Sequence, residues 1–173
     1  MLDPTIQKTV TFSLDGRDVI VGEGTSIWEA ARAEGELIPH LCHKPGSGYR
    51  SDGNCRACMV EIEGERVLAA SCIRTVQEGM VVKTNSDRAK KSRALIVELL
   101  ASDQPERAHD ASSHFKKMSV LNNVYESRFP SKDHIHVPLL DDSHVAMRVN
   151  LDSCIHCNLC VRACREVQVN DVI

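Results

Sequence analysis

The chain contains 173 residues, 42% of them hydrophobic and 3% aromatic, and its formal net charge is −3 at pH 7. This length allows one domain or two small ones, and the nearly balanced charge provides no basic face for nucleic acid. No apolar run approaches the roughly 18 residues of a membrane-spanning helix, and the first residues lack the pattern of a secretory signal. The sequence therefore predicts a cytoplasmic protein that binds neither nucleic acid nor a membrane.

The N-terminal part predicts an α+β fold. Residues 9–14 alternate as a strand, Asp15 and Gly16 form a hairpin turn, and residues 17–21 return as a second strand. Ser26 and Glu29 fit a capping box for a helix over residues 27–34 that ends at a glycine. Further strands are expected at residues 59–62, 66–70 and 80–84. A hairpin followed by a helix indicates a β-grasp domain, which we place at residues 1–86.

A helix and an irregular connector are expected at residues 87–144. The helix covers residues 87–101, where Leu95, Ile96, Leu99 and Leu100 form an apolar stripe. The basic residues at its start, Arg88, Lys90, Lys91 and Arg93, are expected on a solvated surface. A shorter helix is indicated near Phe115, Met118 and Leu121, and residues 126–144 are expected to be irregular. Residues 145–149 then alternate as a strand that leads into a third domain at 145–173.

Four cysteines between residues 41 and 72 point to a metal site. Intracellular thiols rarely form disulfides, and these four are separated by twelve, two and thirteen residues. Each iron of a [2Fe-2S] cluster takes two thiolates, and glycines at 46, 48 and 53 allow the loop to wrap closely around such a cluster. The predicted ligands of a [2Fe-2S] cluster are Cys42, Cys55, Cys58 and Cys72.

Two other interpretations use the same thiols. A zinc site would use all four, although zinc sites usually combine two short cysteine pairs and only one short pair is present here. A thioredoxin-like redox pair at Cys55 and Cys58 would require a helix start near a βαβ unit. Both remain as alternatives that the spacing fits less well.

The other four cysteines follow the spacing Cys-x2-Cys-x2-Cys-x3-Cys, which is typical of bacterial [4Fe-4S] ferredoxins. In two-cluster ferredoxins the first three thiols hold one cluster and the fourth holds another. On that pattern Cys154, Cys157 and Cys160 are ligands of one [4Fe-4S] cluster, and Cys164 is a ligand of a second. No cysteine remains to complete either cluster. Either all four thiols bind a single cluster, or, as we expect, the natural chain continues beyond residue 173 and the ferredoxin domain is truncated here.

Residues 41–43, 53–61, 69–72 and 78–82, with both cysteine spacings, resemble the N-terminal ferredoxin domain of the large iron–sulfur subunit of NADH:quinone oxidoreductase. A similar domain begins [FeFe]-hydrogenases and the α subunit of NAD-dependent molybdenum or tungsten formate dehydrogenases. Relatives of the first two kinds carry a further cluster site with one histidine and three cysteines. The matching segment, residues 102–115, contains no cysteine. Residues 44–50 and 62–66 look most similar to formate dehydrogenase, and Arg165 replaces the usual proline after the last cysteine.

The resemblance implies electron transfer through iron–sulfur clusters in a formate dehydrogenase that converts formate and NAD+ to CO2 and NADH. The rest of the α chain would hold a molybdenum or tungsten bis-molybdopterin guanine dinucleotide, so no catalytic residue is expected among these 173. A partner β subunit would carry FMN and bind NAD, and a small ferredoxin-like γ subunit would complete the complex. Alternatives are a subunit of NADH:quinone oxidoreductase or hydrogenase, a stand-alone ferredoxin-like carrier, and a zinc-binding interaction module.

Several further residues lie near the cysteines or stand out by type. His43 and His156 are neighbours of predicted ligand cysteines. Each could tune the reduction potential of a cluster, or could simply be exposed to solvent. Three arginines are expected near the clusters, namely Arg56, Arg162 and Arg165. Their positive charge could favour the reduced state of a cluster, or they could be solvated loop residues. Trp28 is expected in the core. Surface positions are expected for His109, His114, His134, His136 and His144.

Overall fold

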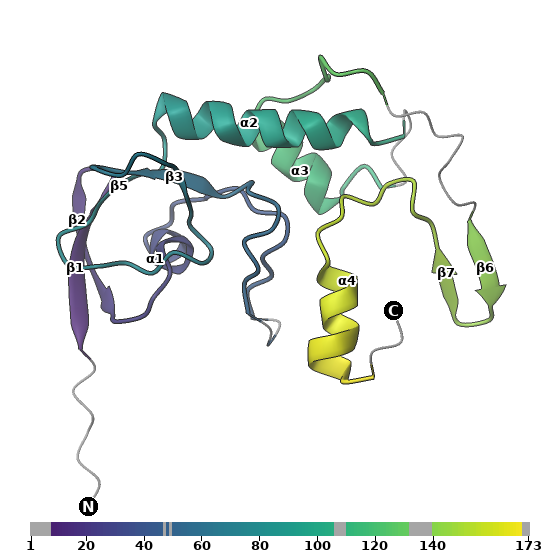
Figure 1. The fold of residues 1–173 in the computed structure, drawn as a ribbon, viewed down its shortest axis with the longest axis horizontal. Helices are drawn as coiled ribbons and strands as arrows, with labels where there is room; N and C mark the ends of the chain where they lie inside the picture. The colour runs from purple at the N-terminus through teal and green to yellow at the C-terminus, as the bar shows by residue number, and fades with distance from the viewer. Residues whose placement is uncertain (1–7, 47, 49, 106–109, 132–139, 171–173) are drawn as a thin grey trace, which may run out of the picture.

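The computed structural model describes residues 8–170 except 47, 49, 106–109 and 132–139. The expected surface positions of His109, His134 and His136 therefore lie outside the described residues. The sheet and α1 (Ile27–Ala33) occupy one end, and α2 (Asp87–Ser102) and α3 (His114–Leu121) lie across the top (Figure 1). The hairpin of residues 141–149 is at the other end, and the second cysteine group stands between it and the first domain. No helix among the described residues is long and apolar enough to cross a membrane.

The first domain is built on a five-stranded sheet with the strand order β2-β1-β5-β3-β4. Its strands are β1 (Thr9–Leu14), β2 (Arg17–Gly22), β3 (Met59–Ile62), β4 (Ala69–Ala70) and β5 (Val81–Lys83). The central pair β1–β5 is parallel and the other pairs are antiparallel. This arrangement confirms the predicted α+β fold of the ferredoxin type.

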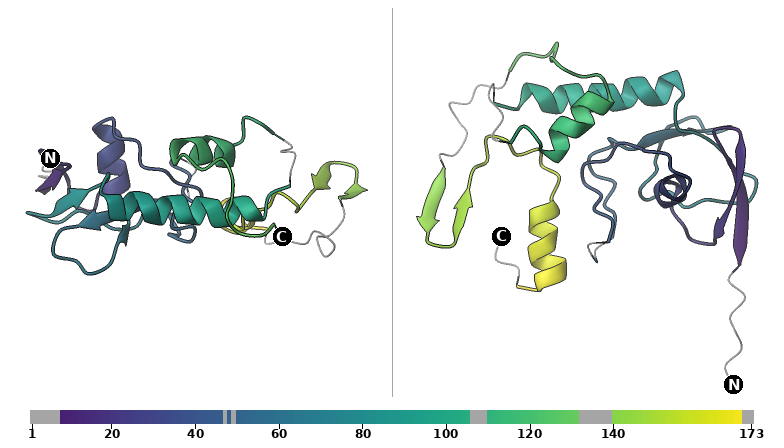
Figure 2. Two further views of the ribbon diagram at one scale, coloured as in Figure 1. Left: turned by 90° about the horizontal axis from the view of Figure 1, so that it is seen from above. Right: turned by 180° about the vertical axis from the view of Figure 1, so that it is seen from behind.

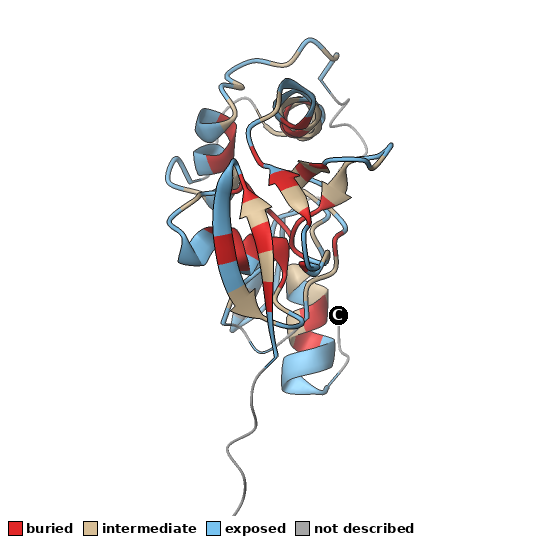
Figure 3. Ribbon diagram, turned by 90° about the vertical axis from the view of Figure 1, so that its left-hand side faces the viewer, coloured by how far each residue is buried: buried red, intermediate tan, exposed pale blue. Residues whose placement is uncertain are grey.

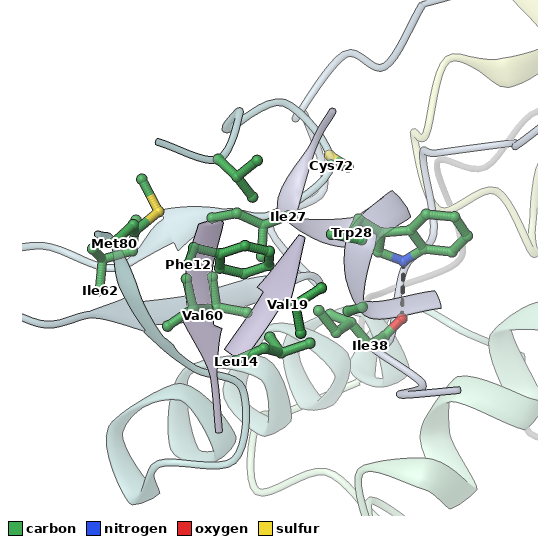
Figure 4. Close-up of a cluster of buried hydrophobic side chains, with 14 of the residues drawn as sticks. Phe12, Leu14, Val19, Ile27, Trp28, Ile38, Val60, Ile62, Cys72 and Met80 are labelled. Carbon is green, nitrogen blue, oxygen red and sulfur yellow. Dashed lines mark hydrogen bonds between the residues drawn. The ribbon is translucent and has the colours of Figure 1, made fainter. Parts of the chain in front are cut away.

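Helix α1 (Ile27–Ala33) packs its buried residues into the core beside this sheet. The predicted capping box is present, because the Ser26 hydroxyl accepts from the Glu29 amide and the Glu29 carboxylate accepts from the Ser26 amide. Buried positions alternate with others along the strands (Figure 3). Trp28 is 3% exposed and donates to the carbonyl of Ile38 at 3.1 Å (Figure 4), so its predicted place in the core is confirmed.

One predicted strand is much shorter than expected. Residues 66–70 were expected to pair fully with β3, but only Ala69 and Ala70 do so. A turn at Gly64, whose φ is +83°, leads into the bend that follows. There the carbonyl of Arg66 accepts from Arg88 of α2 instead of from a neighbouring strand.

Helix α2 (Asp87–Ser102) has a different buried face from the predicted apolar stripe. Leu95 and Leu99 are 41% and 43% exposed, whereas the buried residues are Ala89, Arg93, Val97 and Glu98. The helix contacts β3 and α3 (His114–Leu121). The predicted stripe is therefore wrong at Leu95 and Leu99, whereas Ile96 and Leu100 are half-buried. The solvated position expected for Arg93 is also wrong, because its hydrogen-bond partners lie on the inward side.

The C-terminal part begins with a hairpin of β6 (Asp141–His144) and β7 (Met147–Val149). The irregular region expected up to residue 144 therefore ends in a strand. Val145, expected in the following strand, lies fully exposed in the hairpin turn. The second cysteine group then enters α4 (Leu159–Arg162), which continues into a π-helix, η2 (Ala163–Gln168).

Candidate metal centre

The first cysteine group lies on the long loop between α1 and β3 and on the turn after β4. Cys58 directly precedes β3, and Cys72 follows β4 by two residues. The Ser71 hydroxyl and the Ser71 amide both donate to the carbonyl of Cys58, at 2.8 and 3.2 Å. These bonds join the two segments, so residues far apart in the sequence present their thiols to one site.

The four thiols form two pairs. The Cys42 amide donates to the Cys55 sulfur at 3.4 Å, and the Cys55 amide donates to the Cys42 sulfur at 3.3 Å. The sulfurs of Cys58 and Cys72 are 3.4 Å apart. Three of these residues are buried and Cys55 is partly buried. The pairing Cys42 with Cys55 and Cys58 with Cys72 provides two thiols at each of two adjacent positions.

The electrostatics of each pair favour one thiolate. The hydrogen bond from Cys42 holds the pKa of Cys55 at about 6, and the hydrogen bond from Cys72 holds the pKa of Cys58 at about 7. The same hydrogen bonds raise the pKa of Cys42 and of Cys72. Negative charge on the other three thiols further raises the pKa of Cys72, which indicates that the four sulfurs share one site. Since thiolates are the ligand form, cluster binding must release the remaining protons.

This donor set fits a [2Fe-2S] cluster. Backbone amides, including that of Ala57 at 3.4 Å from the Cys55 sulfur, point at the thiols and would stabilise negative charge there. Gly53 has φ +63°, a left-handed conformation that favours glycine, and a Cβ at this position would displace the end of the Ile73 side chain, 2.8 Å away. The arrangement of the four thiols as two pairs matches two irons better than one zinc ion.

The second cysteine group is less buried than the first, with Cys154 and Cys157 partly buried and Cys160 exposed. Burial raises the pKa of Cys157, and charges on Cys160 and Cys154 raise it further. Left-handed backbone at His156 and Asn158, with φ of 52° and 61°, turns the chain between them. Cys164 is buried and its sulfur lies 2.7 Å from Oδ1 of Asn170.

The two cysteine groups lie against each other. In Figure 1 and in the rear view of Figure 2, α4 stands beside the loop that leads to β3. The Asn54 side-chain amide donates to the His156 carbonyl at 3.1 Å, and Arg162 donates to the carbonyl of Arg50. A small apolar cluster also joins them, and its members are Leu41, Ala57 and Met118 with Cys55, Leu100, Phe115 and Ile155.

The residues predicted to tune the clusters differ in their surroundings. His43 is buried, lies 4.4 Å from the Trp28 ring centroid, and has its Nδ1 2.7 Å from the Ser51 hydroxyl. Of the two alternatives for His43, solvent exposure is therefore wrong. His156, Arg56 and Arg165 are exposed. Arg162 is buried and pairs with Glu166 at 3.1 Å, so it holds α4 in place rather than lying in solvent.

Sequence reasoning missed Arg93. Its guanidinium donates to the carbonyls of Met59 and Thr84 at 3.2 and 2.7 Å, and the side chain is 5% exposed. The signal was available in the helical spacing of Ala89, Arg93 and Val97, which places the arginine between two small apolar residues on one face. Grouping Arg93 with the other basic residues at the start of the helix conceals that its position on the helix faces inward.

Comparison with known proteins agrees with this site. Residues 7–87 match the model of the 2Fe-2S iron-sulfur cluster binding domain. The chain is 33% identical over 171 residues to the HndD subunit of the NADP-reducing hydrogenase of Solidesulfovibrio fructosivorans, covering 95% of this chain and 29% of that protein. It is 31% identical over 164 residues to the 78 kDa subunit of mitochondrial NADH-ubiquinone oxidoreductase of Candida albicans, covering 91% and 22%.

A solved structure has a similar fold. The crystal structure of an NAD+-reducing [NiFe]-hydrogenase in the H2-reduced state superposes with a TM-score of 0.82 at 28% identity, covering 94% of this chain and 68% of that chain. Residues 7–87 therefore form a 2Fe-2S ferredoxin-type domain. The chain as a whole is similar to subunits of hydrogenases and of NADH-ubiquinone oxidoreductase, and it spans less than a third of the curated relatives named above.

Proposed function

We propose that this chain conducts electrons through two neighbouring iron–sulfur sites within a larger NAD-linked oxidoreductase. The ligands of the [2Fe-2S] cluster are Cys42, Cys55, Cys58 and Cys72. Cys154, Cys157 and Cys160 hold a [4Fe-4S] cluster, and Cys164 belongs to a second one. When bound, such clusters accept and release single electrons without making or breaking bonds to the protein.

The observation that carries this proposal is the direct contact between the two cysteine groups. Asn54 precedes Cys55 and hydrogen-bonds the carbonyl of His156, which precedes Cys157. The apolar cluster that includes Cys55 and Ile155 packs against both groups. A fixed connection suits electron transfer, because little of the protein must rearrange when the charge moves.

For the complete enzyme we propose formate as the electron donor. The support is the segment 102–115, which has no cysteine and so cannot supply the three thiols of the additional cluster site found in the quinone reductases and [FeFe]-hydrogenases that this sequence resembles. The rest of the α chain would then carry the molybdenum or tungsten cofactor. An FMN- and NAD-binding β subunit and a ferredoxin-like γ subunit would be the partners.

Hydrogen is the second candidate donor. The similarity to an NADP-reducing hydrogenase subunit and to the NAD+-reducing [NiFe]-hydrogenase structure favours it. In either case the proposed role of the present residues is the same, because they would hold the clusters that conduct the electrons.

The test is to treat the natural complex that contains this chain with formate, hydrogen or NADH and to record EPR spectra after freezing. We expect formate and NADH each to produce the [2Fe-2S] signal, and NAD+ to remove it. A signal produced by hydrogen and not by formate would establish the second candidate. A [2Fe-2S] centre that none of the three reduces would contradict electron transfer in an NAD-linked enzyme.

A further inference from the structure

Arg93 is a buried cation without a carboxylate partner. Its side chain is 5% exposed, and among the described residues no Asp or Glu lies within ion-pair distance of it. Nε of Arg93 is buried and has no hydrogen-bond partner there. Buried arginines are normally paired, because removing a charge from water without compensation is costly. The position therefore requires a source of negative charge.

Two anionic groups act on Arg93, and its hydrogen bond to Met59 places it beside one of them. Arg93 donates to the carbonyl of Met59, which directly follows Cys58, and the charge of the Cys58 thiolate raises the pKa of the guanidinium against the lowering by burial. Asp15 acts on Arg93 in the same direction and more weakly. The Asp15 carboxylate already accepts from the amide and the hydroxyl of Thr84, at 2.7 and 2.5 Å.

We propose that Arg93 is the countercharge of the [2Fe-2S] site and raises its reduction potential. This inference rests on the proposed function, since it requires a cluster on Cys58. Four thiolates and two irons bridged by sulfide carry net negative charge, and reduction adds one more unit. A fixed positive charge in a poorly solvated position stabilises the reduced state more than the oxidised state. Helix α2 thus sets the potential of a centre whose ligands all lie outside it.

The two hydrogen bonds of Arg93 make this a positioned charge. The carbonyl of Met59 belongs to β3, and the carbonyl of Thr84 directly follows β5. The guanidinium is therefore held against the sheet next to Cys58 and cannot turn toward solvent. A neighbouring cation on the exposed side, Lys91, offers a matched control on the same helix.

The experiment is an EPR-monitored redox titration of the [2Fe-2S] centre in anaerobically reconstituted chain carrying Arg93→Gln, Arg93→Lys or Lys91→Met. Arg93→Gln retains donors for the two carbonyls and loses the charge. We expect it to shift the reduction equilibrium toward the oxidised form by about tenfold, which is about 59 mV for a one-electron couple. Arg93→Lys should stay near the wild-type potential, and Lys91→Met should shift little and lose that shift in high salt.

The outcomes separate the two claims. Wild-type chain without a [2Fe-2S] centre would overturn the proposed function and this inference with it. A normal centre whose potential is the same in Arg93→Gln and Lys91→Met would overturn the inference alone. If Arg93→Gln fails to assemble the centre and Arg93→Lys assembles it, the result supports a role for Arg93 as a countercharge. Failure of both would show that the shape of arginine matters rather than its charge, and would also overturn the inference.

Discussion

The side-chain amide of Asn54 donates a hydrogen bond of 3.1 Å to the backbone carbonyl of His156. Each of these residues directly precedes a proposed cluster ligand, Cys55 in one case and Cys157 in the other. A hydrogen bond from a side chain of the first site therefore reaches the backbone of the second. It fixes their separation together with the bond from Arg162 to the carbonyl of Arg50.

Replacing Asn54 by Asp keeps the size of the side chain and removes the donor. We expect Asn54→Asp to lose about 1 kcal/mol of stability and to weaken the magnetic interaction between the two reduced clusters. EPR spectra of the fully reduced chain measure that interaction as broadening or splitting of the signals. Asn85→Asp, at an exposed position in the turn before α2, is the control. Spectra of Asn54→Asp identical to wild type would show that the hydrogen bond does not set the separation.

Gly53 is the glycine whose replacement should disturb the first site most. Its φ of +63° is unfavourable for any residue with a side chain. In addition, an added Cβ would lie only 2.8 Å from the Ile73 side chain. We expect Gly53→Ala to cost about 2 kcal/mol and to lower the occupancy of the [2Fe-2S] cluster, because Cys55 lies two residues away. Iron and acid-labile sulfide analysis measures the occupancy.

Gly46→Ala provides the matched comparison for Gly53→Ala. Gly46 has a similar φ of +73°, but nothing lies within 4 Å of an added Cβ. The Gly46→Ala variant should therefore lose about 1 kcal/mol of stability from backbone strain and keep its cluster. Equal occupancies in the two variants would contradict the steric part of the argument.

Much of the site follows from local sequence, and the remainder depends on contacts across the fold. Cysteine spacing, the Ser26–Glu29 capping box and the Asp15–Gly16 turn are local features, and each was predicted. The inward position of Arg93 depends on the carbonyls of Met59 and Thr84, which belong to other elements. The contact between Arg162 and Arg50 spans 112 residues. No periodicity within α2 or α4 encodes which backbone groups will lie beside it.

Glu98 gives a prediction for the dependence of stability on pH. Its carboxylate accepts from Nε, an NH2 group and the amide of Arg128 at 2.7 to 2.8 Å, which lowers the pKa of Glu98 from 4.5 to about 2. Because the folded-state pKa is below the unfolded value, this contribution is complete above pH 4.5 and is lost as the pH falls toward 2.

The measurement compares the unfolding midpoint of wild type and Arg128→Gln over this pH range. The wild type should be more stable above pH 4.5, and the difference should shrink as the pH falls toward 2. Taking the difference at each pH cancels the acid sensitivity that both chains share. A difference that grows on acidification would contradict the assigned ion pair.

The pairing of the thiols predicts how serine substitutions act. Cys55→Ser should alter or abolish the [2Fe-2S] EPR signal and leave the signal of the other site in place, because Cys55 pairs with Cys42. Cys157→Ser should have the reverse effect. If either substitution removed both signals, the two groups would form one interdependent site rather than two.

We propose that the loop between α1 and β3 and the turn after β4 together hold a [2Fe-2S] cluster. The decisive measurement is iron, acid-labile sulfide and zinc analysis of anaerobically prepared chain, with EPR after reduction. We expect iron and sulfide in equal amounts and a [2Fe-2S] signal that Cys55→Ser changes. Zinc without sulfide, or a [4Fe-4S] signal alone, would contradict it.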